Sequence, residues 1–187
     1  MHNIIIEQPL VEPVSLDEVK LYLRVDGDQE NALLEQLIKS ARRMVEDFTS
    51  RALISQVHQV VSGLDESEDG GIELPFAPFQ SLVALPQVSS GKSVEAVRSF
   101  QLNDTRPQAR VFINHNYYSQ AVARIQYRCG YGDTAASVPE TLRQAILLLV
   151  ADLYENRPGE GVRKSGVKAL PGLVRSLLDP YRIMRFV

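Results

Sequence analysis

The sequence predicts an α+β fold in which a helical core carries a small inserted antiparallel β domain. Three observations predict it: helical apolar periodicity in the first quarter of the 187-residue chain, β-like alternation through its middle, and a strongly apolar helical pattern after that. The core is expected to combine N-terminal helices with a long helix in the C-terminal half. The expected parts are the N-terminal helical part of the core (1–54), the inserted antiparallel β subdomain (55–132), the core helix (133–157), and a loop, short helix and C-terminal tail (158–187).

A capping signal and a regular apolar spacing indicate the N-terminal helices. Residues 15–18 have the form of a capping box, in which the Ser15 hydroxyl accepts a hydrogen bond from the Glu18 backbone N–H and the Glu18 side chain reaches back. The short helix that begins there should stop near Asp26. A longer helix is expected from about residue 28 to residue 50, because its apolar side chains recur at i, i+3, i+4 and i+7. The opposite face of this helix is charged and consists of Glu35, Lys39, Arg42, Arg43 and Glu46.

The middle of the chain has the alternation that is typical of a half-buried sheet. In residues 123–129, Ala, Ile, Tyr and Cys alternate strictly with Arg, Gln and Arg, which predicts a strand with one buried and one solvent-exposed face. Shorter β-like stretches lie at residues 56–61, 82–85, 93–102 and 110–113. Together these stretches predict a small antiparallel sheet of four to six strands.

Helical signals return near Pro139, which suits a first helical turn because its missing N–H would be unpaired there. The apolar stripe from Leu142 to Leu153 is wide, so this helix should be buried on more than one side. Residues 156–169 are polar and rich in glycine, which predicts a loop. A short amphipathic helix is expected at residues 171–178, with Asp179 and Pro180 ending it.

Composition excludes several classes of protein. Hydrophobic residues make up 44% and charged residues 23%, as in ordinary soluble globular proteins. The N-terminus has no signal-like run, and the longest apolar run, residues 145–151, is too short to span a bilayer, so a cytosolic fold is expected. The single cysteine, Cys129, excludes an internal disulfide framework and a multi-cysteine zinc site.

The charge is distributed unevenly along the chain. Up to residue 155 there are 13 basic and 21 acidic residues, a net charge of −8, whereas residues 156–187 hold 7 basic and 2 acidic residues, a net charge of +5. An acidic body with a basic end favours head-to-tail self-association, or contact of the end with an acidic partner or nucleic acid. A basic end that is merely solvated is the alternative.

No residue pattern predicts catalysis, a metal site or a cofactor. The three histidines are scattered, and Cys129 lies on the apolar side of its strand, where a buried, unreactive thiol is expected. A small enzyme built around Cys129 remains an alternative. There is no phosphate-binding loop, and the acidic residues at 65–69 lack the order of a calcium loop. Aromatic residues do not interleave with basic ones, which argues against sequence-specific reading of nucleic acid.

Five segments, taken in order, resemble one family across almost the whole chain. They are the helix and acidic turn at 14–26, the second helix at 30–54, the Leu-Pro and Pro-containing strand at 72–79, the strand end at 127–132, and the helix with its approach at 138–157. This order is similar to that of head–tail connector (adaptor, or head-completion) proteins of tailed bacteriophages, in the subgroup with a β-rich insert. Arg128 and Cys129 depart from the pattern, since smaller residues are common there.

The resemblance implies a structural protein rather than an enzyme. It implies a ring, usually of twelve copies, that forms under the portal protein of a filled head and meets a tail or stopper protein on the other side. Double-stranded DNA would pass through without sequence-specific contact, and neither a cofactor nor a membrane is implied. The implied location is the neck of a phage or prophage-derived virion, assembled in the cytoplasm of the bacterial host.

The resemblance also implies which residues meet partners. The portal-contacting tail would be Tyr181, Arg182, Ile183, Met184, Arg185, Phe186 and Val187. The uneven charge, rather than the resemblance, indicates the basic residues at the ring interface or near DNA: Arg157, Arg163, Lys164, Lys168 and Arg175. The alternative function is a nucleic-acid-binding packaging accessory protein that uses this basic C-terminal region.

Overall fold

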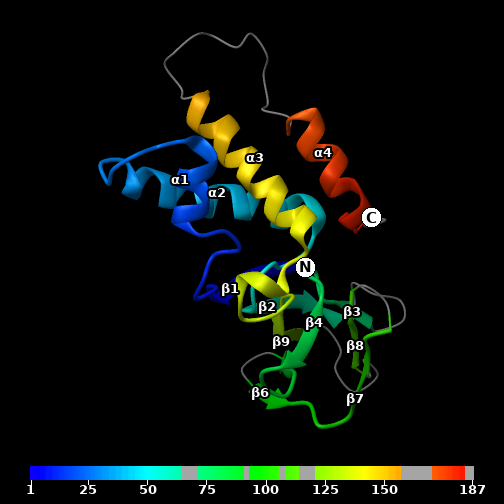
Figure 1. The fold of residues 1–187 in the computed structure, drawn as a ribbon. Coiled ribbons are helices and arrows are strands. Elements are labelled where there is room, and N and C mark those ends of the chain that lie inside the picture. The colour runs from blue at the N-terminus through cyan, green and yellow to red at the C-terminus, as the bar shows by residue number, and fades with distance from the viewer. Residues whose placement is uncertain (65–70, 91–92, 106–107, 114–120, 157–169, 184–187) are drawn as a thin grey trace. The chain divides into compact units, whose positions relative to one another are not determined.

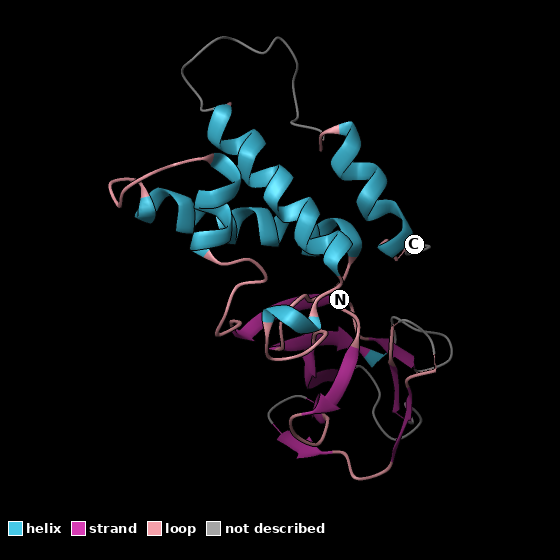
Figure 2. Cartoon of the chain, in the orientation of Figure 1, coloured by secondary structure: helices cyan, strands magenta, loops and turns pink. Residues whose placement is uncertain are grey.

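The computed structural model describes residues 1–64, 71–90, 93–105, 108–113, 121–156 and 170–183. The chain forms two compact units, each of which is described by itself. Unit 1 consists of Met1–Leu10 and Ile54–Asp133, and unit 2 of Val11–Leu53 and Thr134–Val187. In the described residues, unit 1 holds the strands and unit 2 the α-helices (Figures 1 and 2).

The predicted fold class is wrong. The described residues form four α-helices and nine strands in two antiparallel sheets, so the fold is mixed and strand-rich rather than a helical core with a small insert. Most of the strands are only three or four residues long, and the stretch predicted at residues 93–102 holds parts of two of them, Ser93–Ala96 and Phe100–Asn103, which belong to different sheets.

Unit 1 contains a six-stranded and a three-stranded sheet, and all their strand pairs are antiparallel. The larger sheet has the order β1-β2-β9-β5-β6, with β4 also paired to β9, and the smaller one has the order β3-β8-β7. The larger sheet consists of β1 (His2–Glu7), β2 (Gln56–Gly63), β4 (Phe79–Leu82), β5 (Gln87–Ser90), β6 (Ser93–Ala96) and β9 (Val122–Cys129). The smaller sheet consists of β3 (Gly71–Glu73), β7 (Phe100–Asn103) and β8 (Arg110–Ile113).

Strand β9 is the centre of the larger sheet, and it confirms the strand predicted at residues 123–129. It pairs with β2 along the whole length of both strands, from Gln56 opposite Cys129 to Gly63 opposite Val122. Its apolar side chains are buried at every second position, while the arginines between them are exposed. This is the pattern of a strand with one face in the core.

Strand β1 was not predicted, because its partner β2 begins far along the chain and only three isoleucines mark it in the sequence. It forms an edge of the larger sheet and pairs with β2, with Ile5 opposite His58. The Asn3 side-chain amide lies 3.0 Å from Nδ1 of His58, so the edge strand is held by side chains as well as by the ladder.

The fully buried Tyr127 supports the core of unit 1. Its hydroxyl accepts a hydrogen bond from the Phe76 backbone N–H at 3.1 Å, and its ring centroid lies 5.8 Å from that of His58. A buried N–H without an acceptor destabilises the fold, because folding has removed it from water and no hydrogen bond replaces the one that water made.

We therefore expect Tyr127→Phe to lower the free energy of unfolding by about 1–3 kcal/mol, since the Phe76 N–H would lose this acceptor. Urea denaturation followed by circular dichroism measures the change. Tyr22→Phe, at a position that is 41% exposed, is the control. Equal effects of the two variants would contradict the prediction.

Unit 2 is a packed group of helices. Its α-helices are α1 (Leu16–Leu23), α2 (Asn31–Thr49), α3 (Glu140–Glu155) and α4 (Gly172–Leu178), and its 3-10 turns are η3 (Ala135–Ser137) and η4 (Asp179–Tyr181). Helix α3 contacts the other three helices, and α2 also contacts α1 and α4. The buried residues of α2 and α3 recur at helical spacing, which confirms that the apolar stripes predicted for both helices face the core.

The capping box predicted at the start of α1 is confirmed. The Glu18 N–H donates to Ser15 Oγ at 3.1 Å, and the Ser15 N–H donates to the Glu18 carboxylate at 2.7 Å. These hydrogen bonds, the backbone one most strongly, and the nearby Arg143 lower the pKa of Glu18. Arg143 of α3 forms an ion pair with Glu18 and also donates from Nε to the Pro13 carbonyl oxygen at 3.0 Å. The start of α1 is thereby fastened to α3.

Candidate assembly surfaces

Part of the predicted portal-contacting tail lies against the end of α2. The described members of that tail are Tyr181, Arg182 and Ile183, and residues 184–187 lie outside the described residues. Arg51, just after α2, donates from Nε to the Tyr181 carbonyl oxygen at 2.7 Å. The Ile183 N–H donates to the Thr49 carbonyl oxygen at 3.0 Å. Thr49 is the last residue of α2, so this bond uses a carbonyl that the helix itself leaves without a partner.

A third contact comes from Arg182, whose guanidinium carbon lies 5.1 Å from the centroid of the Phe48 ring. The preceding helix, α4, is also held firmly, because Val174 and Leu178 are buried. We call the contacts of Arg51, Thr49 and Phe48 with residues 181–183 the C-terminal anchor. It fixes the place where the chain leaves α4 and its following turn.

Of the five basic residues predicted at the ring interface or near DNA, the structure describes one, Arg175. Arg175 is exposed on α4, with its Nε 4.0 Å from a carboxylate oxygen of Asp179. Arg157, Arg163, Lys164 and Lys168 lie outside the described residues.

A buried ion pair in α2 was not predicted. The Glu46 side chain is 0% exposed and the Arg42 side chain is 7% exposed, and Arg42 Nη1 lies 2.9 Å from Glu46 Oε2. Arg42 Nε also contacts the Glu12 carboxylate at 2.8 Å. The other carboxylate oxygen of Glu46 accepts from the Leu53 N–H at 3.0 Å. The segment before α2 contacts Arg42 through Glu12, and the segment after α2 contacts Glu46 through Leu53. The buried pair thus binds both segments.

The apolar periodicity predicts Arg42 and Glu46 on the charged face of the helix, opposite the apolar one, yet both are buried. Hydrophobic periodicity counts every charge as a surface residue, and it contains no information on Glu12 and Leu53, which come from outside the helix. The i, i+4 spacing of Arg42 and Glu46 is the one sequence signal for the pair.

Burial is the main influence on Glu46, and it raises the pKa of its carboxyl above the ordinary value of 4.5. The charge of Arg42, the hydrogen bond from Leu53 and the charge of Arg43 offset this only in part. The folded protein therefore binds this proton more tightly than the unfolded chain does. The stability that follows from such a shift is fully present below the unfolded pKa and is lost as the pH rises through the folded pKa.

We accordingly expect the unfolding free energy of the wild type to fall relative to that of Glu46→Gln as the pH rises above about 4.5, the ordinary value for this carboxyl. Urea denaturation at a series of pH values measures the difference. Asp47→Asn removes an exposed carboxylate from the same helix and is the control. A difference that grows in favour of the wild type as the pH rises would mean that Arg42, rather than burial, dominates the titration.

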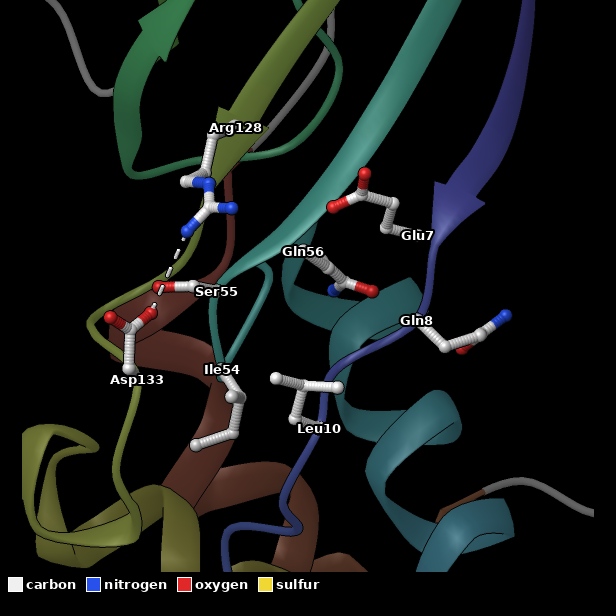
Figure 3. Close-up of a pocket in the computed structure, with 8 residues that line it drawn as sticks. All are labelled: Glu7, Gln8, Leu10, Ile54, Ser55, Gln56, Arg128 and Asp133. Atoms are coloured by element: carbon white, nitrogen blue, oxygen red, sulfur yellow. Dashed lines mark ion pairs between the residues drawn. The ribbon is translucent and has the colours of Figure 1, made fainter. Parts of the chain in front are cut away.

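Unit 1 contains a pocket with a volume of ≈ 360 Å³. It is lined by Glu7, Gln8, Leu10, Ile54, Ser55, Gln56, Arg128 and Asp133 (Figure 3). Arg128 and Asp133 face each other with 4.0 Å between Nη1 and the carboxylate, and the Ser55 hydroxyl shares hydrogen bonds with Gln80. The lining residues include two carboxylates, Glu7 and Asp133, and none of them is a histidine or a cysteine.

Two residues with chemically active side chains, Cys129 and His58, lie in the core of unit 1. Cys129 is buried, as predicted, with its sulfur 4.0 Å from the Gln56 carbonyl oxygen. His58 is also buried, with its ring centroid 4.7 Å from that of Phe76. In the described residues, no three His, Cys, Asp or Glu side chains gather as metal ligands would. No described helix combines the length and apolar character that a membrane span requires.

The sequence matches the head completion protein family over residues 12–184, which is nearly the whole chain. The chain belongs to the head completion protein family. This confirms the family that the order of sequence segments indicated. No curated protein matches the chain at a significant level.

Three solved structures share the fold of this head completion protein. A chain of the virion of the native gene transfer agent (GTA) particle has a TM-score of 0.79 and 23% identity, and the match covers 100% of this chain and 98% of the other. A chain from the neck of the empty GTA particle, computed with C6 symmetry, has a TM-score of 0.77, 22% identity and coverage of 100% and 98%. A chain from the neck of the native GTA particle, computed with C12 symmetry, has a TM-score of 0.62, 22% identity and coverage of 98% and 97%.

Proposed function

We propose that this chain is a structural head–tail connector subunit in the neck of a tailed phage or phage-derived particle. It forms a ring under the portal protein and joins the DNA-filled head to the tail. The observation that carries the proposal is the match to the head completion protein family over residues 12–184. The shared fold with chains of the GTA neck and virion supports the same location.

The proposed ring contains twelve copies, which is consistent with the C12 symmetry of the neck of the native GTA particle. Ring closure requires heterologous contacts, in which one patch of a subunit meets a different patch of the next. Two apolar side chains of unit 2 suit such contacts, since Leu21 on α1 is 83% exposed and Leu173 on α4 is 63% exposed. The acidic body and the basic end of the chain favour the same head-to-tail arrangement.

The proposed partners are the portal protein on one side of the ring and a tail or stopper protein on the other. The C-terminal segment would meet the portal, and double-stranded DNA would pass through the ring with at most non-specific charge contacts. The subunit has no catalytic role in this proposal, and it assembles in the cytoplasm of the bacterial host.

Negative-stain microscopy of the protein mixed with the portal protein of the same particle tests the proposal. We expect an additional ring-shaped layer on the portal. Absence of both free rings and the added layer would overturn the connector function. A monomer in the absence of portal would not, because assembly on a template is part of the proposal.

A salt titration of DNA binding distinguishes the connector from a packaging accessory protein. The connector should bind duplex DNA weakly at physiological salt. Tight binding that weakens steeply with salt would instead indicate that the basic region neutralises several phosphates.

A further inference from the structure

Arg124 is an exposed arginine on the central strand of the larger sheet of unit 1. It lies on β9 between Val61 of β2 and Gln87 of β5, on the face of β9 whose side chains are not buried. Among the described residues, its guanidinium takes part in no hydrogen bond or ion pair. Arg128, on the same face of β9, already has Asp133 as a partner, with 4.0 Å between Nη1 and the carboxylate. Arg124, unlike Arg128, is therefore free to bind another molecule.

Amide side chains and a small pocket surround Arg124. The pocket has a volume of ≈ 20 Å³ and is lined by Gln59, Ala84, Leu85, Gln87, Arg124 and Gln126. Gln126 Nε2 donates to Gln59 Oε1 at 2.9 Å, which orients these two amides. A space of this size holds one small polar group rather than a metabolite. The group that best suits a guanidinium is a carboxylate or a phosphate, because the planar N–H groups match two of its oxygens.

The surroundings of the pocket favour a carboxylate of a protein over a phosphate of DNA. Leu85 is 48% exposed, and Ile4 of β1, which lies opposite Gln59, is 40% exposed. Exposed apolar side chains are stabilised by contact with the apolar surface of another protein, which a phosphate does not offer. Binding to DNA also relies on several cations that neutralise successive phosphates, whereas Arg124 is a single unpaired arginine among the described residues of this face.

Helix α1 of unit 2 presents a carboxylate and an apolar side chain that fit this site. Asp17 is exposed and has no hydrogen-bond or ion-pair partner among the described residues, whereas the neighbouring Glu18 is engaged in the capping box. Leu21 lies one turn after Asp17 on the same side of the helix and is 83% exposed. One copy of the chain thus carries a free carboxylate next to an exposed leucine, and a free arginine next to another exposed leucine, Leu85.

We propose that Asp17 of one subunit binds Arg124 of the next subunit in the ring, with Leu21 packed beside Leu85. This inference rests on the proposed function, which supplies the ring, and it names the two surfaces that meet between neighbouring copies. The surfaces belong to different units of the chain and differ in structure, so the contact is heterologous, as ring closure requires. The opposite charges select the register in which one copy meets the next.

Charge reversal tests the pair in full-length protein assembled on the purified portal protein of the same particle. Arg124→Asp places two carboxylates opposite each other, and Asp17→Arg places two guanidinium groups opposite each other. Each variant should raise the subunit concentration that half-saturates the portal by at least about tenfold. The double variant restores opposite charges and should return that concentration to within about threefold of the wild-type value. Negative-stain microscopy counts the portals that carry the additional layer.

Two control variants match the reversed residues. Arg98→Asp reverses an exposed arginine elsewhere in unit 1, and Asp26→Arg reverses an exposed carboxylate just after α1. Each should change the half-saturating concentration by less than about threefold, since neither residue belongs to the proposed pair. Asp26→Arg combined with Arg124→Asp should not restore assembly. Melting curves followed by circular dichroism should lie close to that of the wild type, because every reversed side chain is exposed.

The outcomes separate this inference from the proposed function. If the wild type adds no layer to the portal and forms no free rings, the connector function itself fails. If the wild type assembles but the double variant is as weak as the single ones, the connector function stands and the pairing of Asp17 with Arg124 is overturned. The carboxylate would then belong to the portal or the tail protein.

Normal assembly by Arg124→Asp would also overturn the pairing. A gel-shift titration of this variant with duplex DNA then identifies the alternative partner. Loss of wild-type DNA binding in Arg124→Asp, with assembly unchanged, would mean that Arg124 contacts a phosphate rather than a carboxylate. The proposal expects the reverse, with weakened assembly and unchanged binding of DNA.

Discussion

Replacing Glu46 with alanine should lower the free energy of unfolding by about 3–5 kcal/mol at neutral pH, because it leaves a buried arginine without its main partner. The Arg42 side chain is 7% exposed, and among the described residues the ion pair left to it would be that with Glu12, which comes from a different segment. The Leu53 N–H would also lose its acceptor in the core of unit 2. Urea denaturation at neutral pH, followed by circular dichroism, measures the loss.

Asp47→Ala is the matched control on the neighbouring position of the same helix. Asp47 pairs with Arg43 in an exposed i, i+4 ion pair, and such pairs contribute only about 0.3–0.5 kcal/mol. A double variant, Arg42→Leu with Glu46→Leu, should recover part of the stability lost in Glu46→Ala, since no unpaired charge remains buried. Equal losses in Glu46→Ala and Asp47→Ala would contradict a structural role for the buried pair.

Replacing Gly130 with alanine is the second change with a large expected effect. Gly130 has φ +136°, and a Cβ there would lie 2.6 Å from the carbonyl carbon and oxygen of Ile54 and from the nitrogen of Ser55. We expect a loss of about 3 kcal/mol or more, because backbone strain costs about 1–3 kcal/mol by itself and the clash is with main chain that cannot move aside locally. Thermal and urea unfolding both measure it.

The variant Gly27→Ala measures the cost of a positive φ without a steric clash, for comparison with Gly130→Ala. Gly27 also has a positive φ, +83°, but a Cβ there would have nothing within 4 Å. Its expected cost is about 1–2 kcal/mol, the penalty of a left-handed conformation alone. Similar losses in the two variants would mean that the segment at Ile54 and Ser55 adjusts to the added methyl group.

The elements that the sequence predicted correctly are those whose signals are local. The capping box at Ser15 and Glu18 lies within four residues, and helices α2 and α3 repeat their apolar positions over several turns. Strand β9 alternates over eight residues. Each pattern is long enough to be recognised without knowledge of its partner.

The elements that were missed depend on contacts distant in the sequence. Strand β1 is identified by its pairing with β2, and the short strand β5 by its pairing with β6 and β9. The buried Arg42–Glu46 pair needs Glu12 and Leu53, which no pattern within α2 reveals. The anchor likewise joins Arg51 to Tyr181, which are 130 residues apart.

Unit 1 is built from two separate stretches of the chain, so it cannot fold during translation until the second stretch has been made. Strand β1 ends at Glu7 and its partner β2 begins at Gln56, and the helices α1 and α2 are encoded between them. At translation rates of about 5–20 residues per second, β1 waits roughly 2–10 s for its partner to be made. During that interval Ile4, Ile5 and Ile6 form an unpaired β segment, which is a hazard for aggregation. On the nascent chain, local helical structure can therefore form before either sheet, and unit 1 reaches its final state only after β9 has left the ribosome.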